Sequence, residues 1–340
     1  MDSSTHENLT QAQAGREDLL PPLVAREATC KKTTIGGQAL IEGLLMLGPE
    51  KQAIAIRQPD GAIKVTVKDR PGKSSKFNVP FLRGIVRLVT QLKTGIEALM
   101  FSADAAMTEE EMEESKSSAF DRFAERHPNF VMGITLIVSL GLSTVLFILL
   151  PSALTDLIRR LTGFGLGVKV GGAVFVLALL EGLTRIILFL LYLWLTSRSS
   201  ELRRVWMYHG SEHKTIACYE AGLPLTVDNV KNQSRLHPRC GTSFIFVVML
   251  ISILTFSLVG RYTMWINILI RLALLPLVAG ISYELIHLAG SHDNVFTRTL
   301  VKPGLALQLL TTAEPDHGMM EVAIEATKAV IPDNPDDDLW

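Results

Sequence analysis

The chain has few cysteines and almost no net charge, and both shortages exclude classes of protein. Only three cysteines, Cys30, Cys218 and Cys240, occur among 340 residues. Their odd number and irregular spacing do not suit a secreted domain held by disulfides, so we expect a reducing compartment. The formal net charge is −1. A chain without a basic excess is poorly suited to neutralise phosphates, and we therefore expect no nucleic-acid partner.

The beginning of the chain lacks the apolar core of a signal peptide. Residues 1–32 are mostly polar and contain prolines, which predicts a disordered tail. The rest of the chain is apolar: hydrophobic residues make up 48% of the sequence, and the mean hydropathy is +0.29. This value is high for a soluble protein of ordinary charge, so we expect a membrane protein that contacts lipid.

Four apolar stretches are long enough to cross a bilayer as helices, which takes about 20 residues. They are Val131–Leu150, Val170–Thr196, Ser243–Val259 and Met264–Leu288. An even number of spans places both termini and the loop 197–242 on one side. That loop is rich in arginine and lysine, so the positive-inside rule predicts cytoplasmic termini in a multi-pass protein of the plasma membrane. Three basic residues in the opposite loop weaken this orientation.

The segments outside residues 131–290 predict smaller elements. Ala53–Lys68 alternates apolar and other residues around Pro59-Asp60-Gly61, which is typical of a β-hairpin. Phe81–Met100 has the pattern of an amphipathic helix, which we expect on the membrane surface or against the spans. The acidic run Thr108–Glu114 predicts a solvated linker.

The predicted fold class is therefore mainly α: a polytopic membrane protein with about four transmembrane helices and a small N-terminal element, a β-hairpin plus an amphipathic helix. The N-terminal element covers residues 33–130 and lies in the cytoplasm. The membrane region covers residues 131–290, and residues 291–340 form a cytoplasmic C-terminal tail.

The polar stretch YHGSEHKTIACYE raises the question of a metal site. If Ser200–Glu220 is helical, His209 and His213 lie one turn apart on the same face, where two imidazoles can hold one cation. Glu212 lies beside them and could accept a proton from a bound water. The string matches H-x-x-E-H, the inverted zinc-peptidase motif. The alternative is a pair of surface histidines that cap a juxtamembrane helix.

Further residues could complete the metal site at the same membrane face. His237 and Cys240 precede the third span, and both residue types ligate zinc. Alternatively, His237 caps a turn and Cys240 is a small core residue. Glu284, near the end of the fourth span, is an ionisable group that needs a partner in the membrane. Glu220 is less suitable, because it lies two turns from His213.

Two other features favour structural roles. Glu181 and Arg185 are four residues apart in the second span and can neutralise each other. The glycine-rich segment Ile35–Gly43 predicts a strand with bulges. From that strand, Gln38 and Glu42 could face the metal site.

Several long strings make the chain resemble the YqhQ-like family of bacterial membrane proteins. They are GGQALIEGLLMLGP, YHGSEHKTIACYE, LTVDNV, HPRCGTSF, GISYELI and PGLALQLLTTAEPD, in this order. The resemblance covers nearly everything after Thr33 and implies a multi-pass membrane protein of a family described as predicted metal-dependent enzymes. It marks as signature positions His209, Glu212, His213, His237, Arg239 and Cys240, without assigning their roles.

The sequence leaves three classes of function open. In the first, the protein is a metal-dependent hydrolase: His209 and His213 bind zinc, Cys240, His237 or Glu284 completes the ligands, and Glu212 is the catalytic base. In the second, the metal only ties the loop to the third span, and the protein is a scaffold or regulator of a membrane-protein partner or of its own oligomer. Transport, the third, has few polar residues in the spans to support it.

Overall fold

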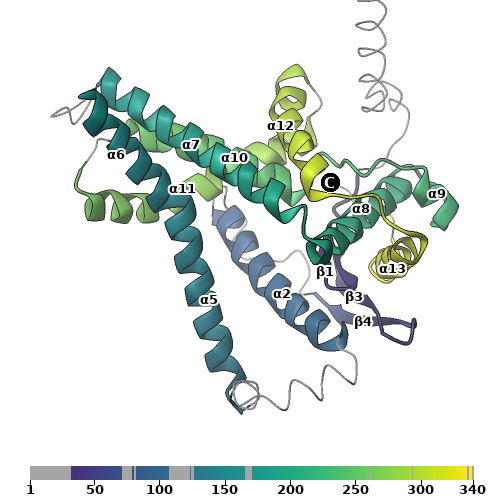
Figure 1. Ribbon diagram of the computed structural model, residues 1–340. Coiled ribbons are helices and arrows are strands. Elements are labelled where there is room, and N and C mark those ends of the chain that lie inside the picture. Colours follow the sequence, from purple (N-terminus) through teal and green to yellow (C-terminus); the bar gives the residue numbers. More distant parts are fainter. Residues whose placement is uncertain are drawn as a thin grey trace, which may run out of the picture.

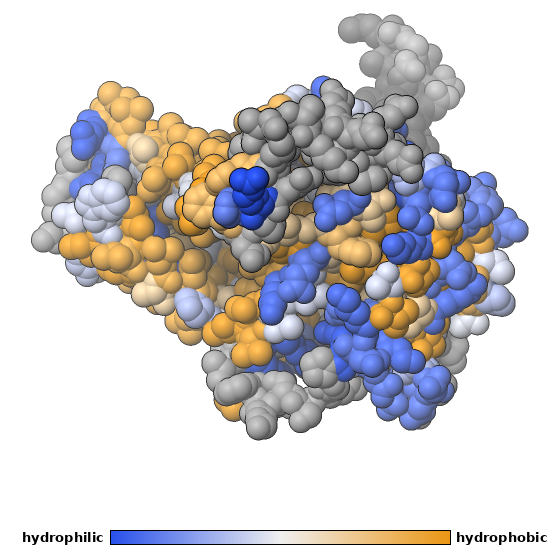
Figure 2. Space-filling view, turned by 90° about the horizontal axis from the view of Figure 1, so that it is seen from below, coloured by the Kyte–Doolittle hydropathy of each residue, from blue (hydrophilic) through white to orange (hydrophobic). Residues whose placement is uncertain are grey.

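The computed structural model describes residues 32–70, 82–106, 126–164, 171–259, 262–292, 294–334 and 337–338, together with Val79 and Phe123. The predicted disordered tail, except for Lys32, and the predicted linker Thr108–Glu114 lie outside these residues. A group of long helices occupies one side of the molecule, and a sheet flanked by further helices occupies the other (Figure 1). The surface follows this division, since apolar residues dominate the first side and polar residues the second (Figure 2).

Four helices in the described residues are long and apolar enough to cross a membrane, which confirms the predicted fold class. The first candidate span combines α5 (Pro128–Thr144), the π-helical turn η1 (Val145–Leu149) and α6 (Leu150–Thr162). The other three are α7 (Gly172–Thr196), α10 (Gly241–Leu258) and α11 (Met264–Ser291).

The first span does not end before Pro151, where the sequence analysis placed its end, but continues to Thr162. The π-helical turn η1 ends at Leu149, two residues before this proline. A π-turn shifts the hydrogen-bond pattern locally, so a residue without a backbone N–H is accommodated within a continuous helix. The Phe147 carbonyl in this turn accepts a hydrogen bond of 2.9 Å from Arg185 Nε.

Glu181 and Arg185 lie buried in the bundle, as a helical i,i+4 pair predicts, with 3.4 Å between Glu181 Oε1 and Arg185 Nη2. Arg271 of α11 also pairs with Glu181, at 2.5 Å. The pair is therefore part of a three-residue cluster that joins α7 to α11. Buried charges of this kind are tolerated when each one is paired and hydrogen-bonded.

The N-terminal sheet has four antiparallel strands in chain order: β1 (Gly36–Leu40), β2 (Gly43–Leu47), β3 (Lys51–Arg57) and β4 (Ile63–Asp69). The predicted hairpin corresponds to β3 and β4. The glycine-rich segment forms β1 and the turn that leads into β2. Both faces of β2 are buried, so this strand lacks the polar alternation that would have identified it.

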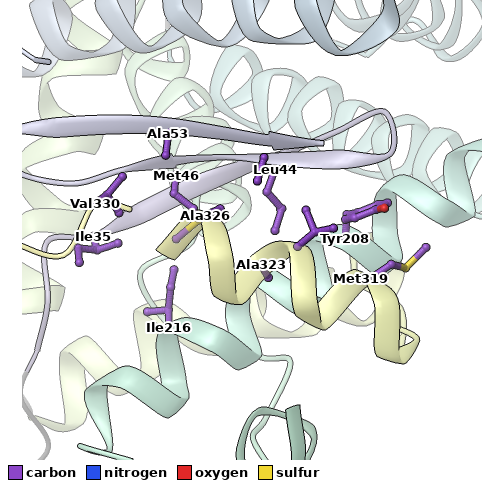
Figure 3. Close-up of a cluster of buried hydrophobic side chains, with 12 residues drawn as sticks. Ile35, Leu44, Met46, Ala53, Tyr208, Ile216, Met319, Ala323, Ala326 and Val330 are labelled. Carbon is purple, nitrogen blue, oxygen red and sulfur yellow. The ribbon is translucent and has the colours of Figure 1, made fainter. Parts of the chain in front are cut away.

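Helices cover both faces of the sheet. On one face, Leu44 and Met46 pack against α8 (Ser200–Glu220) and α13 (His317–Lys328), as Figure 3 shows. On the other face, Leu45 and Ile54 pack with Ala98 of α2 (Leu82–Ala106). Alternate side chains of each strand therefore reach different helices, which holds α8 firmly against the sheet.

The predicted amphipathic helix is present as α2, but its small residues face the sheet. A side chain at Gly95 would collide with Gln38, and Ala98 is 1% exposed. The larger apolar residues point outwards, with Val89 at 61% and Leu92 at 62% exposure. This outward apolar stripe is suited to contact with lipid.

The predicted C-terminal tail contains two helices that pack onto the rest of the protein. Helix α12 (Val295–Thr311) packs against α10, where a side chain at Gly304 would collide with Ser243. Helix α13 contributes Met319, Val322 and Ala323 to the core under the sheet. The segment between them, residues 312–316, passes close to α8, because the Ala313 N–H donates to the Trp206 carbonyl.

Candidate metal centre

Helix α8 buries a continuous run of polar residues, although polar helices usually lie on the surface. Every residue from Tyr208 to Cys218 is buried, including His209, Glu212 and His213. The helix covers the range that the sequence predicted, and Gly222 follows it with a left-handed φ of 66°. Buried polar groups cost free energy unless they are paired, so this run indicates a site rather than a solvated face.

His209, His213 and Cys240 form a compact cluster between α8 and the start of α10. One possible ligand atom from each residue lies within 4.8 Å of the others. The two imidazole rings are 4.4 Å apart between centroids, and His209 Nε2 lies 3.2 Å from Cys240 Sγ. Cys240 occupies the N-cap position of α10, so it lies directly at the start of this candidate membrane span. The sequence left open which of Cys240, His237 and Glu284 could complete a metal site, and of these the structure brings Cys240 next to the two histidines.

Backbone carbonyls fix the orientation of both imidazoles. His209 Nδ1 lies 2.8 Å from the Thr311 carbonyl oxygen, and His213 Nδ1 lies 2.6 Å from the Arg235 carbonyl oxygen. A carbonyl oxygen can only accept, so each Nδ1 carries a hydrogen and each Nε2 is directed into the cluster. Metal-binding histidines are commonly held by the same kind of hydrogen bond.

His213 Nε2 is buried and has no hydrogen-bond partner. Leaving a buried nitrogen unsatisfied costs about 1–3 kcal/mol. A metal ion bound by this nitrogen would remove that cost, so the residues present fit a metal by their chemistry and by this unsatisfied atom.

The electrostatics of the cluster favour a thiolate at Cys240. Burial alone would raise the pKa of the Cys240 thiol, but the His213 and His209 imidazoles hold this pKa well below its usual range. Burial alone would lower the pKa of His209, but its hydrogen bond to Cys240 and the charges of Cys240 and Glu212 raise this pKa to about 9. A metal bound by both atoms would replace the proton that they share.

Glu212 is also buried, on the side of α8 that faces β1. The Gly37 N–H donates to its carboxylate, whereas Oε2 has no hydrogen-bond partner. Burial raises the pKa of Glu212, and the imidazoles of His209 and His213 offset only part of this effect. A carboxyl group with a raised pKa is better suited to exchange a proton near neutral pH than an ordinary glutamate.

Position 37 of β1 lies so close to β2, with Glu212 also near, that only glycine fits there without a shift of the neighbours. A Cβ there would lie 2.6 Å from the Leu45 carbonyl oxygen and 3.1 Å from Glu212 Cδ, whereas a Cβ at Gly36 has nothing within 4 Å. We expect Gly37→Ala to lower the free energy of unfolding by about 1–3 kcal/mol, because overpacking forces the neighbours apart.

Gly36→Ala is the matched control, since it lies in the same strand and has open space around it. Thermal unfolding of both variants in detergent measures the difference. Equal midpoints for the two variants would contradict the close packing around Gly37.

The structure places His237 next to the cluster but pairs it elsewhere. Its ring centroid is 5.7 Å from that of His213, and its Nε2 lies 3.5 Å from Glu220 Oε2. Glu220 also forms a close ion pair with Arg239. Burial lowers the pKa of His237, and the hydrogen bond to Glu220 only partly opposes this. His237 is not part of the three-residue ligand group, and its position suits a supporting role.

The other residues considered from the sequence make contacts elsewhere. The Glu284 carboxylate of α11 forms a two-point ion pair with Arg83 of α2, with Arg83 Nε 2.8 Å from Glu284 Oε1. Glu42 binds Arg204, and Gln38 packs at Gly95. None of these three belongs to the cluster of His209, His213 and Cys240.

Sequence reasoning missed the residues that support the cluster. Gln308 of α12 accepts from the His237 N–H at 2.8 Å and donates to the His237 carbonyl at 2.7 Å. Thr311 supplies a backbone carbonyl, an interaction that leaves no signature in the sequence. The string PGLALQLLTTAEPD contains both residues, and its place among the family strings was the one available signal.

Comparisons with known proteins place the chain in a family. Residues 79–333 match the family described as "Protein of unknown function (DUF1385)". Over 301 residues, the chain is 37% identical to the "Uncharacterized protein YqhQ" of Bacillus subtilis (strain 168), covering 86% of this chain and 90% of that protein. No solved structure matches the chain significantly. The family match and this relative confirm the resemblance seen in the sequence strings: the chain belongs to the DUF1385 family and is a relative of YqhQ.

Proposed function

We propose that the protein is a zinc-dependent hydrolase that acts at the cytoplasmic face of the plasma membrane. One observation carries this proposal: two imidazoles oriented by backbone carbonyls converge with a thiol on one point, and a buried carboxylate lies beside them. The basic residues of the segment 197–242 support the cytoplasmic location of this face.

The ligand set favours zinc. Imidazole nitrogen and thiolate sulfur suit a borderline-soft cation, whereas magnesium and calcium prefer oxygen. Three protein ligands are typical of catalytic zinc sites, in which a water molecule takes the fourth position. When bound, zinc would supply a water molecule with a lowered pKa.

The protein's own groups would orient the ligands and move the proton. The carbonyls of Thr311 and Arg235 hold His209 and His213 with their Nε2 atoms directed into the site. Glu212 Oε2, which has no partner, is the atom placed to take up a proton as general base. Burial of the site excludes bulk water, which strengthens these electrostatic interactions.

A structural metal is the second candidate, because the three ligands come from two segments. His209 and His213 belong to α8, and Cys240 is the N-cap residue of α10, so a metal would link α8, which packs on the sheet, to the membrane helix α10. In that case the protein is a scaffold for a membrane partner or an oligomer, and Glu212 has no chemical role.

A search for products tests the hydrolase proposal. Purified protein loaded with zinc is incubated with lipid and peptide extracts of cells that lack the gene, and mass spectrometry identifies products that have gained the mass of water. We expect such products with the zinc-loaded protein, and we expect chelation to abolish them and added zinc to restore them.

Cys240→Ser should lose this activity, because serine is a poor zinc ligand. Cys218→Ser is the matched control. Cys218 is a buried cysteine of α8, the helix that carries both histidines, and it is not part of the cluster. Products that persist in Cys240→Ser, or that are insensitive to chelation, would contradict the proposal.

A further inference from the structure

An open cavity of about 340 Å³ is lined by Arg235 and Thr312, which belong to the two segments whose backbone carbonyls hold His213 and His209. Ser197, which caps the C-terminal end of α7, lines it. Because α7 is a candidate membrane span, its end marks the boundary between hydrocarbon and headgroups. The cavity therefore lies at the level where lipid headgroups would be.

Two arginines give this cavity a positive character. Arg203 of α8 and Arg235 both line it, and Arg203 is exposed. Arg235 donates to the Thr312 carbonyl through Nη1. One acidic residue, Glu314, also lines the cavity, but its carboxylate lies 2.5 Å from Lys214 Nζ and is neutralised by it. The cavity is thus suited to an anion, and guanidinium groups match the geometry of phosphate oxygens.

Trp206 adds an aromatic side chain to the cavity lining. Its indole Nε1 is buried, so the N–H itself does not reach the cavity. The aromatic ring can contribute an apolar contact beside the two arginines.

The remaining wall is apolar. Leu309 and Leu310 of α12 line the cavity, and Leu309 is 47% exposed. A positively charged pocket bounded by leucines at the edge of a membrane span is suited to a molecule with a phosphate and an acyl chain. We propose that this cavity binds the phosphate group of an anionic phospholipid from the surrounding leaflet.

The cavity and the metal cluster share two segments. The Arg235 carbonyl holds His213, and Thr312 follows Thr311, whose carbonyl holds His209. A lipid bound to Arg235 therefore lies next to the groups that orient both imidazoles. The binding site itself depends on neither zinc nor hydrolysis, so it is tested independently of the proposed function.

Native mass spectrometry of the delipidated full-length protein in detergent measures this binding. The probes are dioctanoyl phosphatidylglycerol, dioctanoylglycerol, which lacks the phosphate, and inorganic phosphate as a competitor. We expect phosphatidylglycerol to bind at least about ten-fold more tightly than dioctanoylglycerol, because charge-assisted hydrogen bonds to the arginines are lost without the phosphate. Equal affinities for the two lipids would overturn the proposal.

Inorganic phosphate distinguishes the two sources of the anion. If the occupant is a lipid, millimolar phosphate displaces little phosphatidylglycerol, because it gains nothing from the leucine wall. Complete displacement by phosphate at concentrations similar to those of the lipid would overturn the lipid assignment and identify a site for a soluble phosphate.

Two substitutions locate the binding in this cavity. Arg203→Gln removes an exposed charge and should weaken phosphatidylglycerol about ten-fold. Trp206→Phe shrinks the aromatic side chain that lines the cavity and should weaken binding about two- to ten-fold, because apolar contact is lost. Arg198→Gln is the matched control, since Arg198 stacks on Trp194 and is not among the cavity-lining residues. Unchanged binding in both Arg203→Gln and Trp206→Phe would overturn the proposal.

Discussion

Replacing His209 or His213 with alanine is expected to remove nearly all zinc from the purified protein. The wild type should contain about one zinc ion per chain, the stoichiometry of a single three-ligand site. Each alanine variant leaves one imidazole and one thiolate, a set that lacks the affinity of three converging ligands. Elemental analysis of protein purified without added metal, normalised to protein mass, measures the loss.

Two further variants serve as controls for this measurement. His317→Ala changes an exposed histidine on α13 whose side chain is 71% accessible, so it should retain the full zinc content. Glu284→Gln should also retain zinc, because the Glu284 carboxylate pairs with Arg83. Size-exclusion profiles show whether the alanine variants remain folded. Folded His209→Ala and His213→Ala proteins with wild-type zinc content would exclude the metal site.

The sequence predicted those parts of this structure that local patterns determine. Membrane spans follow from long apolar runs. If Ser200–Glu220 is helical, the spacing of His209, Glu212 and His213 already places them together, and α8 has these bounds. The hairpin of β3 and β4 followed from alternation around a Pro-Asp-Gly turn.

Other features depend on packing between distant segments and could not be predicted in this way. The sequence could not choose among Cys240, His237 and Glu284, because all three precede or end a span at the same face. The choice depends on competing partners: Glu220 contacts His237, and Arg83 contacts Glu284, which leaves Cys240 next to His209. Likewise, β2 and the C-terminal helices are buried on more than one side, so their sequences lack clear amphipathic alternation.

Glu212→Gln is expected to abolish the function while leaving zinc bound. The substitution keeps the size of the side chain and its ability to accept from the Gly37 N–H, but it removes the proton acceptor at Oε2. Loss of a general base typically reduces a rate by about 100-fold or more. The fold should tolerate the change well, because burial raises the pKa of Glu212 and a neutral amide avoids the cost of a buried charge.

Complementation of a deletion strain measures this loss, with membrane abundance and zinc content determined in parallel. Glu220→Gln separates a chemical role from a structural one. Glu220 is a largely buried glutamate at the end of the same helix, where it pairs with Arg239 and His237 and accepts from the Thr33 N–H. If Glu212 acts as a base, Glu212→Gln fails to complement at normal abundance with zinc retained, whereas any defect of Glu220→Gln follows its abundance. A catalytic role for Glu212 would be excluded by full complementation at normal abundance, and the zinc would then tie α8 to α10 in a membrane scaffold.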